Sequence, residues 1–120
     1  MKHNIEQQEQ IQFINYLRDK HPDILFTIAP NGMKLPIFVA VNLKRMGYTA
    51  GTPDIMIFEA RGGFNGLFIE MKAPKTIFSN KGTLQANQQD FLLKLEKRGY
   101  YIDLYEYEKN FYYNGFSFPG

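Results

Sequence analysis

Two carboxylates and one ammonium group lie in short segments of the chain that are otherwise apolar. Asp54 comes directly before the apolar run 55–58, while Glu70 and Lys72 follow the apolar run 67–69. If these runs are strands, the alternation of side chains places Glu70 and Lys72 on the same face. Carboxylate oxygens are the ligands that Mg²⁺ and Mn²⁺ prefer, with water positions left for a substrate phosphate. The pattern therefore suggests a metal site for phosphate chemistry.

The same residues also have an interpretation without chemistry. Glu70 and Lys72 could form an ion pair that contributes at most about 1 kcal/mol, and Asp54 could simply cap a turn after Pro53. However, apolar residues flank both carboxylates, and an unpaired carboxylate in such surroundings would be costly. We therefore favour metal ligation.

The two apolar runs are predicted to form an antiparallel hairpin. They are separated by the segment 61–66, whose adjacent glycines supply the positive φ angles of a tight turn. A turn at these glycines places Asp54 opposite Met71 or Lys72, within cross-strand reach. Met71 points to the face opposite Glu70, which leaves its backbone carbonyl near the carboxylates. The carbonyl is thus a candidate for a further metal ligand.

Residues 4–20 are predicted to form the first helix. Their apolar arc includes Phe13, and the middle of the arc lies close to Glu6. Glu9 also lies within this arc, although further from its middle. One of these two carboxylates is therefore expected to extend the inward-facing stripe of the helix.

Two more helices are predicted further along the chain. Residues 37–46 follow a proline and precede a glycine, the residue types that start and stop helices. A longer helix ends at Gly99 and carries Gln88 on the same stripe as Phe91 and Leu95. Gln88 is therefore expected to face inward.

The remaining apolar runs are predicted to be strands. Residues 24–29 read as a buried strand ended by the turn 30–32, residues 100–105 as another strand, and residues 111–116 as the top of a terminal hairpin. The order αβαββαβ, with a β extension, predicts an α/β fold in which helices flank a mixed sheet.

Composition limits the class of protein. A chain of 120 residues with 44% hydrophobic and 22% charged residues is the size and type of one soluble domain, so we expect a single domain over residues 1–120. The absence of cysteine excludes disulfides, thiolate zinc sites and cysteine nucleophiles. The polar start and the lack of a long apolar window predict a cytoplasmic protein, in the host cytoplasm if viral, with no membrane partner.

Positive charge is concentrated in the middle of the chain. Residues 31–88 contain seven basic and three acidic residues, a net charge of +4, whereas the segments on either side each have a net charge of −1. Such a distribution favours a polyanionic partner, although solvated surface lysines would give the same count. The candidate DNA-binding residues are Lys34, Lys44, Arg45, Lys75 and Lys81.

The motifs in these segments occur together in a known family. The sequence GTPD at 51–54, the sequence GLFIEMK at 66–72 and the placement of Gln88 resemble the VRR-NUC (virus-type replication-repair nuclease) branch of the PD-(D/E)xK nuclease superfamily, in its stand-alone phage or bacterial form. The likeness extends over nearly the whole chain. A PD…ExK match alone is common by chance, and the combination is much more specific.

The resemblance implies a restriction-endonuclease-like core that hydrolyses phosphodiester bonds with Mg²⁺ or Mn²⁺. It implies that Asp54 and Glu70 are metal ligands, that the Met71 carbonyl is a further ligand, and that Lys72 lies near the attacking water. Gln88 would lie over the site. The first helix would supply another acid, for which Glu6 matches the family spacing and Glu9 is the competitor. Relatives tend to have an acid before the glutamine, where this chain has Asn87.

These expectations combine into one function. We expect a metal-dependent endonuclease for DNA, selective for branched structures such as four-way junctions, that acts in replication, recombination or repair. A twofold homodimer is expected, with the aromatic-rich end 100–118 as its contact, unless this hairpin folds back on its own sheet. The alternatives are a catalytically inactive nucleic-acid-binding domain and a protein-interaction domain with a nuclease-like fold.

Overall fold

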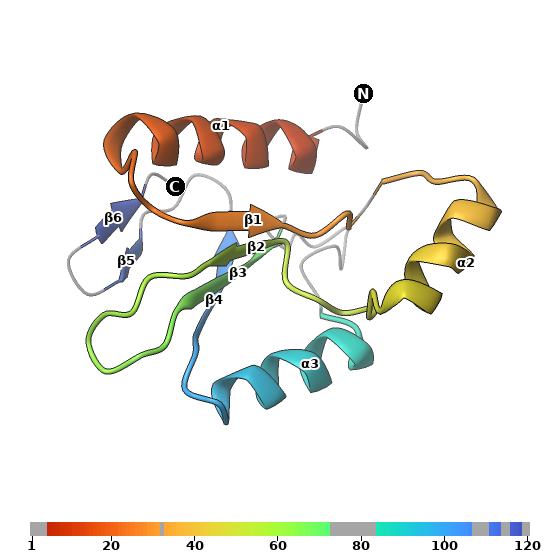
Figure 1. Cartoon of the computed structure of the whole chain (residues 1–120). Helices are drawn as coiled ribbons and strands as arrows, with labels where there is room; N and C mark the ends of the chain where they lie inside the picture. Colours follow the sequence, from red (N-terminus) through yellow and green to blue (C-terminus); the bar gives the residue numbers. More distant parts are fainter. Residues whose placement is uncertain (1–4, 32, 73–83, 107–110, 114–115, 119–120) are drawn as a thin grey trace, which may run out of the picture.

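The computed structural model describes residues 5–31, 33–72, 84–106, 111–113 and 116–118 (Figure 1). Helices and strands follow one another along the chain in the predicted order αβαββαβ, followed by a terminal hairpin. The elements are α1 (Ile5–Lys20), β1 (Phe26–Ile28), α2 (Ile37–Met46), β2 (Ile55–Ile57), β3 (Leu67–Lys72), α3 (Ala86–Glu96), β4 (Tyr101–Glu106), β5 (Phe111–Tyr113) and β6 (Phe116–Phe118).

The first four strands form a mixed sheet in the order β1-β2-β3-β4. β1, β2 and β3 pair antiparallel, whereas β4 lies parallel to β3. A parallel neighbour requires a crossover connection, and α3 supplies it. β5 and β6 form a separate antiparallel pair. The predicted mixed α/β fold is confirmed.

α1 and α3 lie on opposite sides of the sheet (Figure 1). On the α1 side, Phe13 and Leu17 pack in one buried cluster with the odd-numbered residues of β2 and β3, among them Ile55 and Met71. The even-numbered residues of β3 therefore point to the α3 side. The two-residue period of β3 thus directs Glu70 and Lys72 away from the core formed with α1.

The register of the hairpin differs from the prediction. Ile55 pairs with Ile69 and Ile57 with Leu67, so that continuing the ladder places Asp54 opposite Glu70 rather than Met71 or Lys72. The cause lies near the turn, where an isolated bridge joins Arg61 to Phe64. Between this bridge and the ladder the first strand contains one residue more than the second. The extra residue shifts the pairing.

The predicted strand within residues 24–29 is confirmed, but the prediction that it is buried is wrong. β1 is an edge strand of only three residues, and the side chains of Leu25 and Ile28 are 67% and 47% exposed. A short apolar run does not show by itself whether the strand lies inside the sheet or at its edge.

Within the described residues, no helix combines the length and apolar character needed to cross a membrane.

Candidate active site

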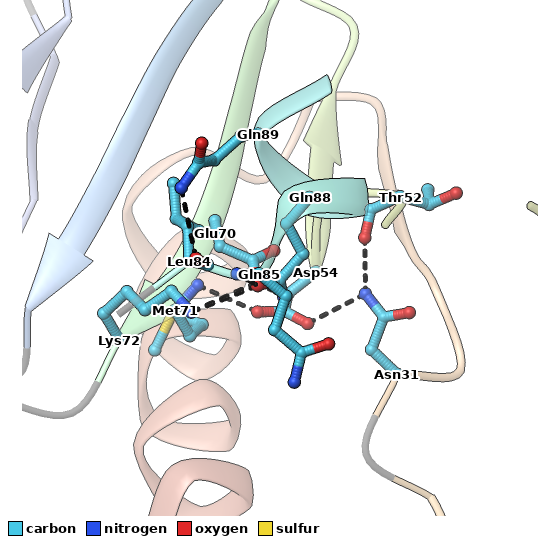
Figure 2. A network of polar contacts seen from close by, with 10 residues as sticks. All are labelled: Asn31, Thr52, Asp54, Glu70, Met71, Lys72, Leu84, Gln85, Gln88 and Gln89. Carbon is cyan, nitrogen blue, oxygen red and sulfur yellow. Dashed lines mark hydrogen bonds and ion pairs between the residues drawn. The ribbon is translucent and has the colours of Figure 1, made fainter. Parts of the chain in front are cut away.

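Four polar side chains meet on the α3 side of the sheet (Figure 2). Asp54 precedes β2, Glu70 and Lys72 belong to β3, and Gln88 belongs to the first turn of α3. Asp54, Glu70 and Lys72 are only 4%, 3% and 8% exposed. The structure therefore brings together four of the residues that the sequence singled out, in an environment where charges interact strongly.

Gly51 allows the loop before Asp54 to approach α3. Its φ is +95°, and a Cβ at this position would lie 2.6 Å from the backbone oxygen of Asn87. Only glycine combines this backbone conformation with such close contact. The glycine of the GTPD sequence therefore brings the Asp54 loop next to the helix turn that carries Gln88.

Both carboxylate oxygens of Asp54 accept hydrogen bonds. The backbone N–H of Met71 donates to Oδ2 at 2.8 Å, and the Asn31 side-chain amide donates to Oδ1 at 3.0 Å. The first bond ties Asp54 to β3, and the second ties it to the loop after β1. Asp54 is thus held from two sides, with its orientation defined by the backbone of its neighbour strand.

Gln88 connects Glu70 to Lys72. Its Nε2 donates to Glu70 Oε2 at 2.7 Å, while its Oε1 accepts from the Gln85 backbone N–H at 2.9 Å and lies 3.5 Å from Lys72 Nζ. Lys72 Nζ also lies 4.0 Å from Glu70 Oε2. The bond from Gln85 fixes which end of the Gln88 amide faces Glu70 (Figure 2).

Sequence reasoning missed Asn31, Tyr48 and Thr52 as parts of this site. The Asn31 amide donates to the Thr52 carbonyl at 2.6 Å as well as to Asp54, and the Tyr48 hydroxyl donates to the Asn31 side-chain oxygen. These three contacts orient the amide that holds Asp54. An asparagine in the turn 30–32 was a detectable signal, because it follows a strand predicted to join the same sheet. Tyr48 carried no such signal.

Burial opposes ionisation of the two carboxyl groups. The pKa of Glu70 is raised from its ordinary value of 4.5 to about 8, first by burial and then by the charge of Asp54, with Lys72 opposing both. Burial also raises the pKa of Asp54, although its hydrogen bonds from Asn31 and Met71 lower it. In the absence of a cation, the pair is expected to retain a proton at neutral pH.

The oxygen atoms of this pair fit a hard divalent cation. Glu70 Oε1 is buried and, within the described part of the chain, has no hydrogen-bond partner. A buried oxygen without a partner is costly, and a cation beside it would remove that cost. Asp54 and Glu70 contribute only oxygen, the donor type suited to Mg²⁺ or Mn²⁺. No set of three or more His, Cys, Asp or Glu side chains placed to hold an ion occurs among the described residues.

The structure distinguishes between Glu6 and Glu9, the two candidate acids of α1. The charge of Glu6 raises the pKa of Glu70, whereas the charge of Glu9 raises the pKa of Tyr105, which burial raises most strongly. Glu6 is therefore the acid near the site, which favours it over Glu9. Its side chain is exposed, however, so Glu6 does not extend the inward-facing stripe of the helix, as its place in the apolar arc predicted. Its catalytic role remains a prediction.

The stability of the metal-free protein is expected to fall as pH rises. The unfolded chain loses the Glu70 proton near 4.5, whereas the folded protein keeps it up to about 8. Between these values the folded state binds more protons, so its free energy of unfolding decreases with pH. In EDTA at pH 9, Glu70→Gln should therefore melt at a higher temperature than the parent protein. This difference in melting temperature should become smaller as the pH is lowered toward 5.

Differential scanning fluorimetry across this range would measure the effect. Glu96→Gln, at the exposed end of α3, is the matched control for loss of one negative charge. Burial also raises the pKa of Asp103, to about 6, and this shift likewise lowers the free energy of unfolding as pH rises. Its contribution is the same in all the variants compared. A pH dependence in Glu70→Gln identical to that of the parent protein would contradict the assignment.

The candidate DNA-binding residues that can be placed are exposed. Lys34 lies on the segment between β1 and α2, and Lys44 and Arg45 lie in the last turn of α2. Lys75 and Lys81 fall outside the described residues. α2 lies beyond the end of the sheet, to the right of it in Figure 1. The positively charged side chains of Lys34, Lys44 and Arg45 are therefore accessible to a polyanion.

The chain is similar to known proteins over most of its length. A family model of the VRR-NUC domain matches residues 6–105, a span that contains Asp54, Glu70, Lys72 and Gln88. A solved structure named VRR_NUC domain protein is 27% identical in sequence, with a TM-score of 0.61; the match covers 84% of this chain and 76% of that one. No curated protein matches the chain. These findings confirm the resemblance and the nuclease-like fold.

Proposed function

Since the chain belongs to the VRR-NUC family, a nuclease family, we propose that it is a metal-dependent endonuclease that hydrolyses DNA phosphodiester bonds. One observation carries the proposal beyond the family. The buried carboxylates of Asp54 and Glu70 lie beside Lys72, and one Glu70 oxygen has no hydrogen-bond partner among the described residues. A structural ion pair with Lys72 would not need a second buried carboxylate.

Asp54 and Glu70 would hold the cation, Mg²⁺ or Mn²⁺. The carbonyl of Met71 is a further ligand in this proposal. The N–H of Met71 donates to Asp54, and the N–H and C=O of one strand residue point to the same side of the strand. When bound, the cation supplies positive charge that favours ionisation of a water molecule and offsets charge on the phosphate.

Lys72 and Gln88 have separate tasks in the proposed reaction. The Lys72 ammonium would orient the attacking water and stabilise its anionic form, since it is buried beside the carboxylates. Gln88 would hold one oxygen of Glu70 so that the other faces the reacting groups. Glu6 would add negative charge from α1. None of these steps requires a covalent enzyme intermediate.

We propose branched DNA, such as a four-way junction, as the preferred substrate in replication, recombination or repair. The described elements are the sheet, its three helices and the terminal strand pair, and they include no insertion that would read base edges, so shape and deformability are the features left to recognise. Junction, flap, duplex and single-stranded oligonucleotides should be compared with Mg²⁺, Mn²⁺ or EDTA. Binding without cleavage under all conditions would favour an inactive nucleic-acid-binding domain, and no binding would favour a protein-interaction domain.

Replacing a lysine or arginine that contacts a phosphate by alanine should weaken the salt dependence of DNA binding. Lys34→Ala, Lys44→Ala and Arg45→Ala, together with Lys75→Ala and Lys81→Ala, are each expected to reduce the slope of log K against log salt by roughly one unit. Fluorescence anisotropy in Ca²⁺ would measure the slopes.

Lys97→Ala provides the control. Lys97 lies nine residues beyond Gln88 at the far end of α3, about 13 Å along a helix. Slopes that remain unchanged in all five variants would place the DNA on another surface.

We also propose a homodimer, since a second site would allow paired cuts in a junction. In the aromatic-rich end 100–118, which the sequence predicts as the contact, Tyr105 is buried and Tyr100 stacks on Phe68, and the side chains from residue 106 onward lie outside the described residues. Exposed apolar side chains instead occur on α2, where Ile37 and Phe38 lie. Of the surfaces that the structure describes, this one is the more suitable contact.

The dimer is expected in sedimentation velocity at micromolar protein, and Phe38→Lys should shift it toward monomer. Phe58→Lys is the control, because Phe58 is another exposed phenylalanine but lies directly after β2. A single 14 kDa species, with and without junction DNA, would exclude the dimer.

A further inference from the structure

A cavity of about 400 Å³ lies beside the candidate active site. Its walls come from α2, from the segments on either side of that helix and from the start of α3, and include Leu35, Ala40, Tyr48 and Asn87. Two further wall residues belong to the site itself. Asn31 donates to Asp54, and Gln88 donates to Glu70. The cavity is therefore separated from each carboxylate by one side chain.

The described lining of the cavity is neutral. It contains no acidic or basic side chain, so it offers no countercharge to a phosphate. The lining combines apolar groups such as Leu35 and Ala40 with the phenol of Tyr48 and with side-chain amides. A nucleobase has flat faces that pack on apolar and aromatic groups, and edges that exchange hydrogen bonds with amides. The lining thus suits an unpaired base better than the charged backbone.

The hydrogen bonds already present indicate which groups remain for a ligand. The Asn31 amide is engaged by Thr52, Asp54 and Tyr48, so its role is to form a rigid wall. The exposed amide of Asn87, at the start of α3, carries both a donor and an acceptor. Asn87 is therefore the residue best suited to contact a base edge.

We propose that this cavity binds an unpaired nucleobase of the nucleotide next to the bond that is cut. The proposal rests on the nuclease function above and deepens it. A base can enter only where the duplex is interrupted, as at a flap, a bulge or a junction, and the cost of unpairing is then small. Insertion of the base would place the adjoining phosphate beside Asp54 and Glu70, which gives selectivity for DNA structure without sequence reading.

Filling the cavity tests the proposal. Ala40→Phe places a ring in it, whereas Val41→Phe places the same ring on the next residue of α2, which does not line the cavity. Asn87→Ala is a second test variant, at an exposed helix position where truncation should leave the fold intact. The substrates are duplexes with one unpaired adenine and the same duplexes with an abasic analogue at that position.

The parent protein and Val41→Phe should cleave the adenine substrate about tenfold faster than the abasic one, the usual effect of one base-stacking contact. Ala40→Phe and Asn87→Ala should lose this difference and still cleave both. Equal preference for adenine in all four proteins would overturn the proposal. So would a parent protein that cleaves both substrates at the same rate.

A binding measurement separates this proposal from the nuclease function. In Glu70→Gln with Ca²⁺, an unpaired 2-aminopurine should change fluorescence on binding, and adding Ala40→Phe should abolish the change. A retained signal without cleavage by the parent protein would reject the proposed hydrolysis and support the base site. Cleavage by the parent protein without any 2-aminopurine signal would reject the base site alone.

Discussion

Glu70→Gln is expected to lower the rate of DNA cleavage at least about a thousandfold, the scale of several kcal/mol of lost transition-state stabilisation. The substitution removes the negative charge and keeps the volume. Glutamine can still offer an oxygen to the Gln88 amide, so the contact that positions this side chain survives. The loss would therefore come from metal binding rather than from the fold. Initial cleavage rates on a junction oligonucleotide with Mg²⁺ and Mn²⁺ would measure it.

Asp54→Asn should abolish cleavage as well, but it is the less clean variant. Both Asp54 oxygens accept hydrogen bonds, from Met71 and from Asn31, and an asparagine amide would present N–H groups to one of these donors. That conflict would add a loss of stability to the loss of a ligand. Glu96→Gln is the control for charge, and circular dichroism and DNA binding in Ca²⁺ should remain unchanged in Glu70→Gln. Near-parental cleavage by both variants would remove the metal-site assignment.

The elements and their order could be predicted because their signals are local. α2 begins and ends where a proline and Gly47 predict, and the predicted antiparallel pairing of β2 with β3 is confirmed. The alternation along β3 was sufficient to place Glu70 and Lys72 on one face, where their charged atoms lie 4.0 Å apart. Periodicity therefore identified most of the candidate site before the register was known.

The register and the surroundings of Asp54 could not be predicted in this way. A single extra residue between the Arg61–Phe64 bridge and the ladder moved the pairing, and nothing in the glycine-rich segment encodes that shift. Asn31 lies 23 residues from Asp54 along the chain, and Tyr48 lies 17 residues from Asn31. Their hydrogen bonds depend on how α2 and two loops pack together, which no local pattern records.

Lys72→Met is expected to reduce cleavage by roughly two to four orders of magnitude without loss of metal binding. Methionine keeps most of the side-chain volume in this buried position, while Lys72→Arg keeps the charge and is the matched comparison. The two carboxylates would remain in place, since Asp54 is held by Met71 and Asn31, and Glu70 by Gln88. The positive group that orients and stabilises the nucleophile would be absent.

The pH at which metal binding is measured decides how this variant is interpreted. Lys72 lowers the pKa values of both Asp54 and Glu70, so without it the carboxyl groups keep their proton to higher pH and compete more strongly with the cation. Calorimetric titration with Mn²⁺ should therefore show weaker binding by Lys72→Met near pH 7 and recovered binding near pH 9, with cleavage still low at both. Glu70→Gln should bind weakly throughout. Failure of Lys72→Met to bind Mn²⁺ at pH 9 would make Lys72 part of the metal site itself, and cleavage at the parental rate would show that the nucleophile does not depend on its charge.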